Sequence, residues 1–289
     1  MAPEAIAWAA QPFALSRQEY ARFARIITDR TGIRMPEEKL TMAQSRLVRR
    51  IHQLQLSSFE EYRQYLLCSP DSEQEYVHFI DAITTNKTDF FREPQHLDYL
   101  KDHALPALEH DACPGHPGLA KVWCAGCSSG EEAWSLAMTL AEYGKRRSGF
   151  DFSILGTDIS MRMLARAREA TYSRASADAV PPVLRRSYLL SSRDPSHNQI
   201  RIVPYLRRRV AFQRLNFMDR TYGMRNQFEV IFFRNVMIYF DKSTQEAVVN
   251  RLCENLRPGG YLFVGHSESL TGSQVPVRQA ALAVYRKNP

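Results

Sequence analysis

The chain has 289 residues, of which 44% are hydrophobic and 24% are charged. This composition is typical of a globular protein, and the length favours two domains over one. The formal net charge of +7 indicates an acidic partner, which a nucleic acid, an anionic membrane surface or a carboxylate-rich protein would provide. No apolar run is long enough to span a membrane, and the N-terminal segment lacks the basic region of a signal peptide.

The five cysteines are odd in number and irregularly spaced, which indicates a reduced, cytoplasmic protein rather than a disulfide scaffold. Cys124 and Cys127 form a C-x-x-C pair. No second pair of cysteines or histidines follows at the spacing of a zinc site, so no metal centre is expected.

Residues 12–84 are predicted to form a small helical domain. Apolar side chains recur at helical spacing between Ser16 and Gly32, and again after Pro36. Ser58 with Glu61, and Ser72 with Glu75, resemble capping boxes that open a third and a fourth helix. Four short helices joined by short turns indicate a bundle.

Residues 85–289 are predicted to form a doubly wound α/β domain of the Rossmann type. Four apolar strands (KVWCAG, FDFSILGTD, FEVIFF and GYLFVGH) alternate with helices that begin near Glu131, Ser160 and Ser243, and AALAVYRK is expected to be a last strand. Near-continuous apolar strands between helices are typical of a parallel sheet covered on both faces. Residues 186–212 break this alternation, and we expect them to form an inserted β-subdomain.

A small-residue turn follows the first strand of this domain and leads into a helix. Gly126 and Gly130 bracket Cys127, Ser128 and Ser129. Such a turn lets a ligand approach the backbone closely. The acids that open the helix, Glu131 and Glu132, would repel a pyrophosphate but suit an ammonium or sulfonium group.

Polar side chains stand where three other strands end. Asp158 ends the second strand, where doubly wound folds place an acid against ribose hydroxyls. Asn216–Phe217 and Asn235–Val236 follow later strands, and an asparagine amide both donates and accepts, which suits an adenine edge. Together with the glycine turn, these residues predict a nucleoside pocket and a methyltransferase that uses S-adenosyl-L-methionine.

Two long strings of the sequence then identify a family. They are TTNKTDFFRE (residues 84–93) and FRNVMIYFD (residues 233–241), and they stand in order with SSGEE, RPGGYLFVGHSES and SRLVRRIH. The chain closely resembles the chemotaxis-receptor methyltransferase (CheR-type) family from about Ser16 onward. The resemblance implies a cytoplasmic, monomeric protein-glutamate O-methyltransferase that esterifies glutamates on the cytoplasmic helices of chemoreceptors and releases S-adenosyl-L-homocysteine.

The resemblance also implies roles for particular residues. Asn86, Thr88 and Arg92 would line the cofactor or the active site, Asp158 would bind the ribose, and one or both of Glu131 and Glu132 would bind the methionine amine. Asn216, Phe217, Asn235 and Val236 would frame the adenosine and the reacting centre. Arg92 and Tyr239 are the candidate catalytic residues: Arg92 would orient the substrate carboxylate, and Tyr239 would lie beside the methyl group.

A basic helix in the N-terminal domain is a candidate docking surface. Arg46, Arg49 and Arg50 share one helical face, and no acid occurs between Glu38 and Glu60. The resemblance implies that this stripe binds the acidic receptor, whereas a merely solvated face is the alternative. His266, Ser267 and Glu268 resemble a hydrolase fragment, but consecutive residues of a strand face opposite sides, so we interpret them as structural.

The sequence departs from the family at one place and leaves two other functions open. Relatives often carry Gly-x-Gly beside an arginine in the inserted subdomain to hold a receptor peptide, whereas residues 190–195 contain only Arg193 and no glycine. One alternative is a nucleic-acid methyltransferase that grips phosphates through Arg46 and the run of residues 207–209. The other is a non-catalytic module that binds S-adenosyl-L-methionine and signals by contact.

Overall fold

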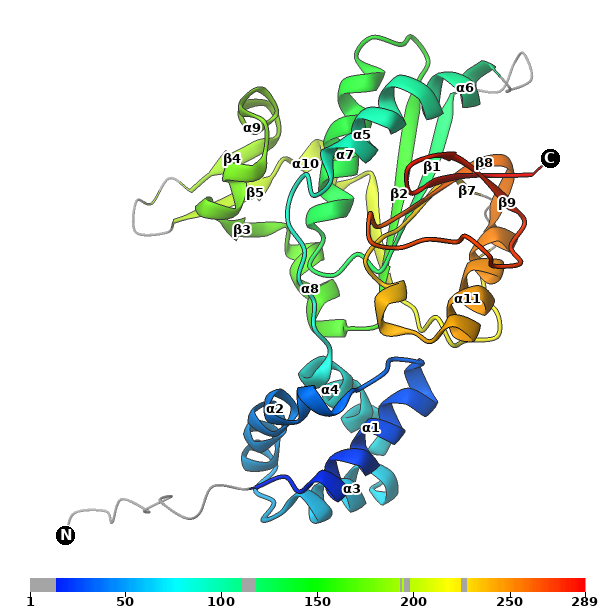
Figure 1. The fold of residues 1–289 in the computed structure, drawn as a ribbon. Helices are drawn as coiled ribbons and strands as arrows, with labels where there is room; N and C mark the ends of the chain where they lie inside the picture. Colours follow the sequence, from blue (N-terminus) through cyan, green and yellow to red (C-terminus); the bar gives the residue numbers. More distant parts are fainter. Residues whose placement is uncertain (1–13, 111–117, 193, 195–197, 225–227, 289) are drawn as a thin grey trace. The chain divides into compact units, whose positions relative to one another are not determined.

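The computed structural model describes residues 14–110, 118–192, 194, 198–224 and 228–288 (Figure 1). The chain divides into two compact units, residues 1–84 and residues 85–289. None of the described helices is both long enough and apolar enough to cross a membrane.

The described part of the N-terminal unit, residues 14–84, forms a bundle of four α-helices, as predicted. They are α1 (Arg17–Thr31), α2 (Leu40–Gln53), α3 (Phe59–Cys68) and α4 (Ser72–Ile83), and a 3-10 turn (Glu37–Lys39) precedes α2. Ser16 and Glu19 form a capping box at the start of α1, and Gly32 ends this helix at φ 70°. Phe23, Tyr62 and Phe79 pack ring against ring, 5.7–6.3 Å apart, in the centre of the bundle.

The capping box expected from Ser72 and Glu75 at the start of α4 is not formed, and the one expected from Ser58 and Glu61 at the start of α3 is only half formed. Ser58 accepts a hydrogen bond from the backbone N–H of Glu61, but the Glu61 carboxylate accepts from Ser57 instead of closing the box. The side chain of Asp71 at the start of α4 makes no capping hydrogen bond. Glu75 is 2% exposed and accepts hydrogen bonds from Arg50 and Tyr62, so its carboxylate serves the core rather than the helix end.

The C-terminal unit is built on a seven-stranded sheet in the order β6-β2-β1-β7-β8-β10-β9. The strands are β1 (Leu119–Ala125), β2 (Asp151–Asp158), β6 (Val210–Arg214), β7 (Phe228–Phe233), β8 (Leu256–Val264), β9 (Val277–Ala281) and β10 (Val284–Lys287). The first five strands of that order pair in parallel, as predicted, and the last two are antiparallel. The segment AALAVYRK is therefore not one strand, because it turns at Leu282 and Ala283 between β9 and β10.

Helices cover both faces of this sheet (Figure 1). They are α7 (Glu131–Gly144), α8 (Met161–Glu169) and α11 (Lys242–Asn255), and a further helical segment comprises α5 (Pro94–Tyr99), a π-helical turn (Leu100–Ala104) and α6 (Leu105–His110). Side chains alternate along β1: Val122 and Cys124 join the apolar cluster that includes α7, whereas the Trp123 ring packs against Tyr222 and Phe228.

A second, three-stranded sheet extends from this unit in the order β3-β5-β4. It consists of β3 (Thr171–Ser173), β4 (Leu189–Ser191) and β5 (Gln199–Ile202), with a 3-10 turn (Arg174–Ala179) and α9 (Pro182–Tyr188) between β3 and β4; the short α10 (Pro204–Arg207) then leads to β6. The small sheet starts earlier than the expected range of residues 186–212. The end of that range belongs to β6, which pairs with β2 of the large sheet.

Candidate active site

The turn after β1 is closed tightly by its two glycines. Gly126 has φ +84° and Gly130 has φ +96°, a region that side chains rarely adopt. A Cβ added at Gly126 would lie 2.5 Å from Cγ2 of Val236, and one added at Gly130 would lie 2.9 Å from Cβ of Ala167. The turn therefore lies against the loop after β7 and against α8, with no room for larger residues.

Asp158 joins this turn to the end of β2. Its two carboxylate oxygens accept hydrogen bonds from the backbone N–H groups of Ser128, at 2.8 Å, and Ser160, at 2.9 Å. Ser160 caps α8 by accepting from the Met163 N–H, so the helix does not need Asp158 as its cap. The acid thus stands at the carboxyl end of β2, beside the glycine turn, where a nucleoside ribose is bound in doubly wound folds.

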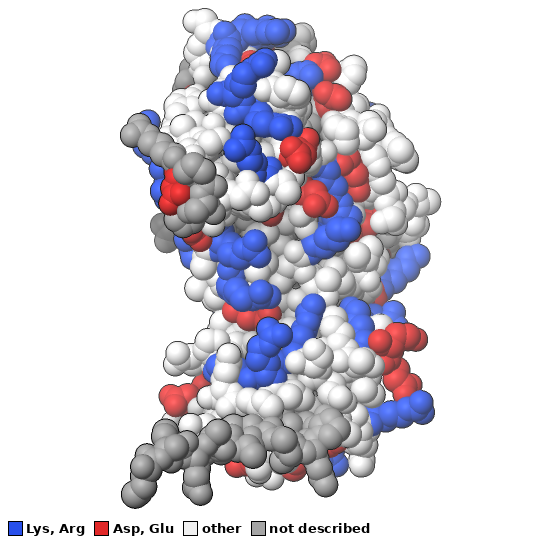
Figure 2. Space-filling view, turned by 90° about the vertical axis from the view of Figure 1, so that its left-hand side faces the viewer, with Lys and Arg blue, Asp and Glu red and all other residues white. Residues whose placement is uncertain are grey.

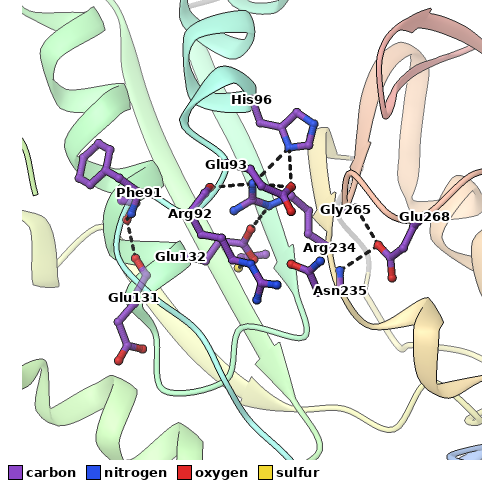
Figure 3. A network of polar contacts seen from close by, with 12 residues as sticks. Phe91, Arg92, Glu93, His96, Glu131, Glu132, Arg234, Asn235, Gly265 and Glu268 are labelled. Carbon is purple, nitrogen blue, oxygen red and sulfur yellow. Dashed lines mark hydrogen bonds and ion pairs between the residues drawn. The ribbon is translucent and has the colours of Figure 1, made fainter. Parts of the chain in front are cut away.

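The two acids at the start of α7 have different surroundings. Glu132 is 7% exposed, pairs with the Nε–H of Arg234, and accepts a hydrogen bond from Sγ of Cys124. Glu131 accepts from Oγ of Ser129 at 2.7 Å; burial raises its pKa, which the Ser129 hydrogen bond and Arg166 partly offset. In Figure 3 the Glu132 side chain points toward Arg234, and the Glu131 side chain points away from it.

Arg234 is the centre of a buried charge network that the sequence reasoning missed. The residue is 5% exposed, and its Nη1 donates to the carbonyl of Arg92 at 2.9 Å, to Glu93 at 3.4 Å and to Nδ1 of His96 at 3.1 Å (Figure 3). Burial, and then the charge of Arg234, lowers the pKa of His96 to about 4, so this ring is neutral at pH 7. The sequence held one signal for this network: an arginine directly follows the largely apolar strand FEVIFF. A cation buried at such a position requires acidic partners.

Within the part of the chain that the structure describes, possible metal donors gather at Glu93, His96 and His266, whose ligand atoms lie within 4.8 Å of one another. Arg234 already donates to the first two of these residues. Because a guanidinium cation occupies the position next to them, a metal ion there would meet its charge at short range.

Another buried carboxylate, that of Glu268, lies near the ends of β7 and β8. Oε2 of Glu268 accepts hydrogen bonds from the backbone N–H groups of Asn235, at 2.8 Å, and Gly265, at 2.7 Å. Glu268 is 7% exposed, and burial raises its pKa against the effect of these hydrogen bonds. Asn235 itself has φ +58°, so the expected adenosine residue is held in a left-handed conformation.

Residues 85–92 bring the candidate catalytic groups to the same edge of the sheet. Oγ of Ser128 donates to the carbonyl of Asn86 at 3.1 Å, and the Tyr239 hydroxyl donates to the carbonyl of Thr85 at 3.4 Å. Burial raises the pKa of the Tyr239 hydroxyl, and the charge of the half-buried Arg92 partly offsets this rise. Arg92 and Tyr239 thus lie near enough to influence each other.

The other residues expected to bind the cofactor include Thr88, Asn216 and Phe217, which differ in how far they are exposed. Thr88 and Asn216 are half-buried, and Oδ1 of Asn216 accepts from the Met218 N–H at 3.0 Å. Phe217 is buried, and its ring packs edge-on against Phe233 at 5.1 Å. The Phe217 side chain therefore belongs to the core, and only its backbone remains to frame a ligand. The expected cofactor and catalytic roles of these residues stay predictions.

Two of the three arginines of the predicted cationic stripe on α2 are half-buried and make contacts within the bundle, and the docking role of the stripe stays a prediction. Arg50 donates to the buried Glu75, with a shortest N–O distance of 2.5 Å, and Nη1 of Arg46 donates to the carbonyls of Ala82, Ile83 and Thr84 at 2.9–3.2 Å. Arg46 and Arg50 thus serve the fold, because the carbonyls that end α4 and the buried acid each need a cation. Arg49 is exposed, and only for this arginine does the outward orientation hold. Arg193 of the inserted subdomain lies outside the described residues.

Comparison with known proteins matches both units. Residues 18–84 match the family model "CheR methyltransferase, all-alpha domain", and residues 86–285 match "CheR methyltransferase, SAM binding domain". A chemotaxis protein methyltransferase of Borreliella burgdorferi is 35% identical over 95% of this chain and 95% of its own. Those of Klebsiella aerogenes and Escherichia coli are each 36% identical, over 92% and 89% of this chain and 88% and 86% of their own.

The order of the two family models is the order of the two structural units, and the relatives cover nearly the full length of both. The chain therefore belongs to the CheR methyltransferase family and is an S-adenosyl-L-methionine-dependent methyltransferase.

Proposed function

We propose that this enzyme transfers the methyl group of S-adenosyl-L-methionine to glutamate side chains on the cytoplasmic helices of chemoreceptors. The product would be a γ-glutamyl methyl ester, formed during chemotactic adaptation in the cytoplasm by a monomeric enzyme. The names of the relatives, chemotaxis protein methyltransferases, and the net charge of +7 support a chemotaxis protein with an acidic surface as the substrate.

The residues at the carboxyl edge of the sheet fit the cofactor. A nucleoside joined to an amino acid requires a closely approachable backbone, an acid for the ribose and a carboxylate for the ammonium group. A Cβ at Gly126 or Gly130 would clash with the neighbouring segments, so only the glycines keep the turn that close to Val236 and α8. Asp158 ends β2 beside this turn, and Glu131 opens α7 with its carboxylate turned away from Arg234.

We assign these residues to the cofactor as follows. Asp158 would hold the ribose. Glu131 would bind the ammonium group, because Arg234 already neutralises Glu132. The side chains of Asn216, Asn235 and Val236, and the backbone of Phe217, would frame the adenosine, with Asn86 and Thr88 on the side of residues 85–92. When bound, S-adenosyl-L-methionine supplies a methyl group on a sulfonium, which is electrophilic without further activation.

The chain's own residues have little acid–base chemistry to perform. A glutamate side chain with a pKa of about 4.3 is already an anionic nucleophile at pH 7. Arg92 would orient the substrate carboxylate through charge-assisted hydrogen bonds, and Tyr239 would border the methyl group. The enzyme's contribution is then alignment and the exclusion of water. The observation that carries this proposal is geometric: the Tyr239 hydroxyl donates to the carbonyl of Thr85 and Oγ of Ser128 donates to that of Asn86. These bonds bring residues 85–92 to the edge where Asp158 ends β2 and Asn235 follows β7.

The test is methyl transfer from labelled S-adenosyl-L-methionine to chemoreceptor cytoplasmic fragments. We expect label on the receptor that mild base releases as methanol, and a loss of at least about 100-fold in Arg92→Ala. Arg278→Ala, at an exposed arginine on the edge strand β9, is the control and should keep wild-type activity. Base-stable label, or label only on added RNA, would refute the glutamate assignment. Cofactor binding without transfer to any fragment would indicate the non-catalytic module instead.

A further inference from the structure

We infer that Glu268 is a positioning residue for methyl transfer: its carboxylate fixes the turn from Asn235 to Tyr239, on which the adenosine and the reacting methyl group are aligned. The inference rests on the proposed placement of Asn235 and Tyr239 in the active site. Glu268 is not a catalytic residue in this account, because it acts through the backbone of the turn.

The Glu268 carboxylate lies between the ends of strands β7 and β8. A tight turn after β8 is closed by a hydrogen bond from the Glu268 N–H to the Gly265 carbonyl at 2.8 Å. This turn directs the side chain back over the sheet edge, where one oxygen, Oε2, accepts from Gly265 after β8 and from Asn235 after β7 (Figure 3). Two charge-assisted bonds to one buried oxygen tie the two strand ends together.

Asn235 has a left-handed conformation, with φ +58°. Asparagine adopts this conformation more readily than most residues other than glycine, so the turn is set by local contacts rather than by strong strain. The Glu268 carboxylate supplies such a contact, because it accepts the backbone N–H of Asn235. The Asn235 side chain also packs closely against the turn after β8: a Cβ added at Gly265 would lie 2.5 Å from Nδ2 of Asn235 and 2.9 Å from Oε2 of Glu268.

The backbone that Glu268 holds at Asn235 continues into the turn that contains Tyr239. A 3-10 turn, Met237–Tyr239, follows directly, and its carbonyl end is held by Nε2 of Gln245, which donates to the carbonyls of Met237 at 2.9 Å and Phe240 at 3.2 Å. Glu268 holds the other end through Asn235. The turn is thus fixed at both ends, and Glu268 holds the end that carries the expected adenosine residue.

The experiment compares Glu268→Ala and Glu268→Gln with a matched control, Glu229→Gln. Glu229 lies on β7, and its Oε2 accepts a backbone N–H from Lys121 of β1 at 2.7 Å, so it makes the same kind of contact at the amino end of the same strand. For each full-length variant we would measure hydrogen exchange of residues 234–240, affinity for S-adenosyl-L-homocysteine, and kcat and KM for receptor methylation.

We expect faster exchange of residues 234–240 and a fall in kcat of about 10- to 100-fold in Glu268→Ala, because a displacement of about 1 Å costs that much. Glu268→Gln keeps an acceptor oxygen and should lie between Glu268→Ala and the wild type in both readouts. KM for the receptor should change by less than about twofold, since Glu268 is buried.

Three results would overturn the inference: unchanged exchange in residues 234–240, faster exchange with an unchanged kcat, or the same effects in Glu229→Gln. Exchange and S-adenosyl-L-homocysteine affinity need no receptor. If the wild type methylated no receptor fragment, the proposed substrate would fail, while these two measurements would still decide the role of Glu268 in ordering the turn.

Discussion

The shape of the turn after β1 depends directly on Gly126. Substitution by alanine combines a strained φ of +84° with a Cβ 2.5 Å from Val236. We expect Gly126→Ala to weaken cofactor binding at least about tenfold, because the turn must move away from the loop after β7. Equilibrium binding of S-adenosyl-L-homocysteine measures this. Gly149→Ala is the control, since Gly149 has a similar φ of +80° with nothing within 4 Å of an added Cβ; equal losses in both variants would contradict the steric argument.

His96 predicts a pH dependence of stability. Its pKa is about 4 in the folded chain and near 6.5 when unfolded, so the unfolded state binds more protons between these values. Above pH 6.5, His96 is neutral in both states and does not lower the free energy of unfolding. As the pH falls from 6.5 toward 4, the free energy of unfolding decreases, with a slope of at most about 1.4 kcal/mol per pH unit. Burial raises the pKa of Glu131 and Glu268, and these groups contribute the opposite slope just above the usual carboxyl range.

Urea unfolding at a series of pH values measures this dependence. His96→Asn should have a shallower slope than the wild type between pH 6.5 and 4, because it removes the group that must stay neutral. His110→Asn, at an exposed histidine near the end of α6, should keep the wild-type slope. A wild-type slope in His96→Asn would show that other groups cause the acid sensitivity.

At the level of elements, α2 shows that arginines predicted to share an exposed face can also make contacts within the bundle. The sequence placed Arg46, Arg49 and Arg50 on one face, and that periodicity is correct. Helical spacing cannot show, however, that α4 supplies Glu75 and its terminal carbonyls to that face. We therefore expect Arg50→Ala to lower the free energy of unfolding by about 3 kcal/mol, because it leaves a buried carboxylate unpaired.

Arg49→Ala is the comparison on the same helix. It should leave the free energy of unfolding within about 0.5 kcal/mol of the wild type, because Arg49 is exposed. If α2 docks on the receptor, the variant should instead raise KM for receptor methylation and leave the affinity for the cofactor unchanged. Denaturant unfolding and initial rates separate the two effects. An unchanged KM in Arg49→Ala would remove α2 from the docking surface.

The central parallel strands were predictable because their apolar runs are nearly continuous and alternate with helices. The order of the strands was not predicted, nor were the place of β6 in the large sheet and the separation of β9 from β10. The helical segment from α5 to α6 was not predicted, although Leu97, Leu100, Ala104 and Leu108 recur at helical spacing; a π-helical turn and Pro106 interrupt it. The polar residues at the strand ends were found from the sequence. The contacts of Arg234 and Glu268 were not, because they join segments that lie 33 to 142 residues apart.

Over the whole molecule, the surplus of positive charge predicts how receptor and cofactor recognition differ. Lys and Arg gather over the face that carries α9 and the small sheet (Figure 2), and Arg166 and Arg186 of this unit are exposed. Attraction between exposed charges of opposite sign is screened within about 8 Å at physiological ionic strength. Asp158 and Glu131, the acids proposed to bind the cofactor, are buried, and contacts at buried charges are screened much less.

We therefore expect KM for the receptor fragment to rise several-fold between about 0.05 and 0.5 M salt, while the affinity for S-adenosyl-L-homocysteine changes by less than about twofold. Initial rates and equilibrium binding at the same salt concentrations measure both quantities. Sodium chloride and potassium acetate should act alike at equal ionic strength, because screening does not depend on the identity of the ion. A receptor KM that does not respond to salt would mean that apolar contacts dominate docking, and the net charge of +7 would then need another explanation.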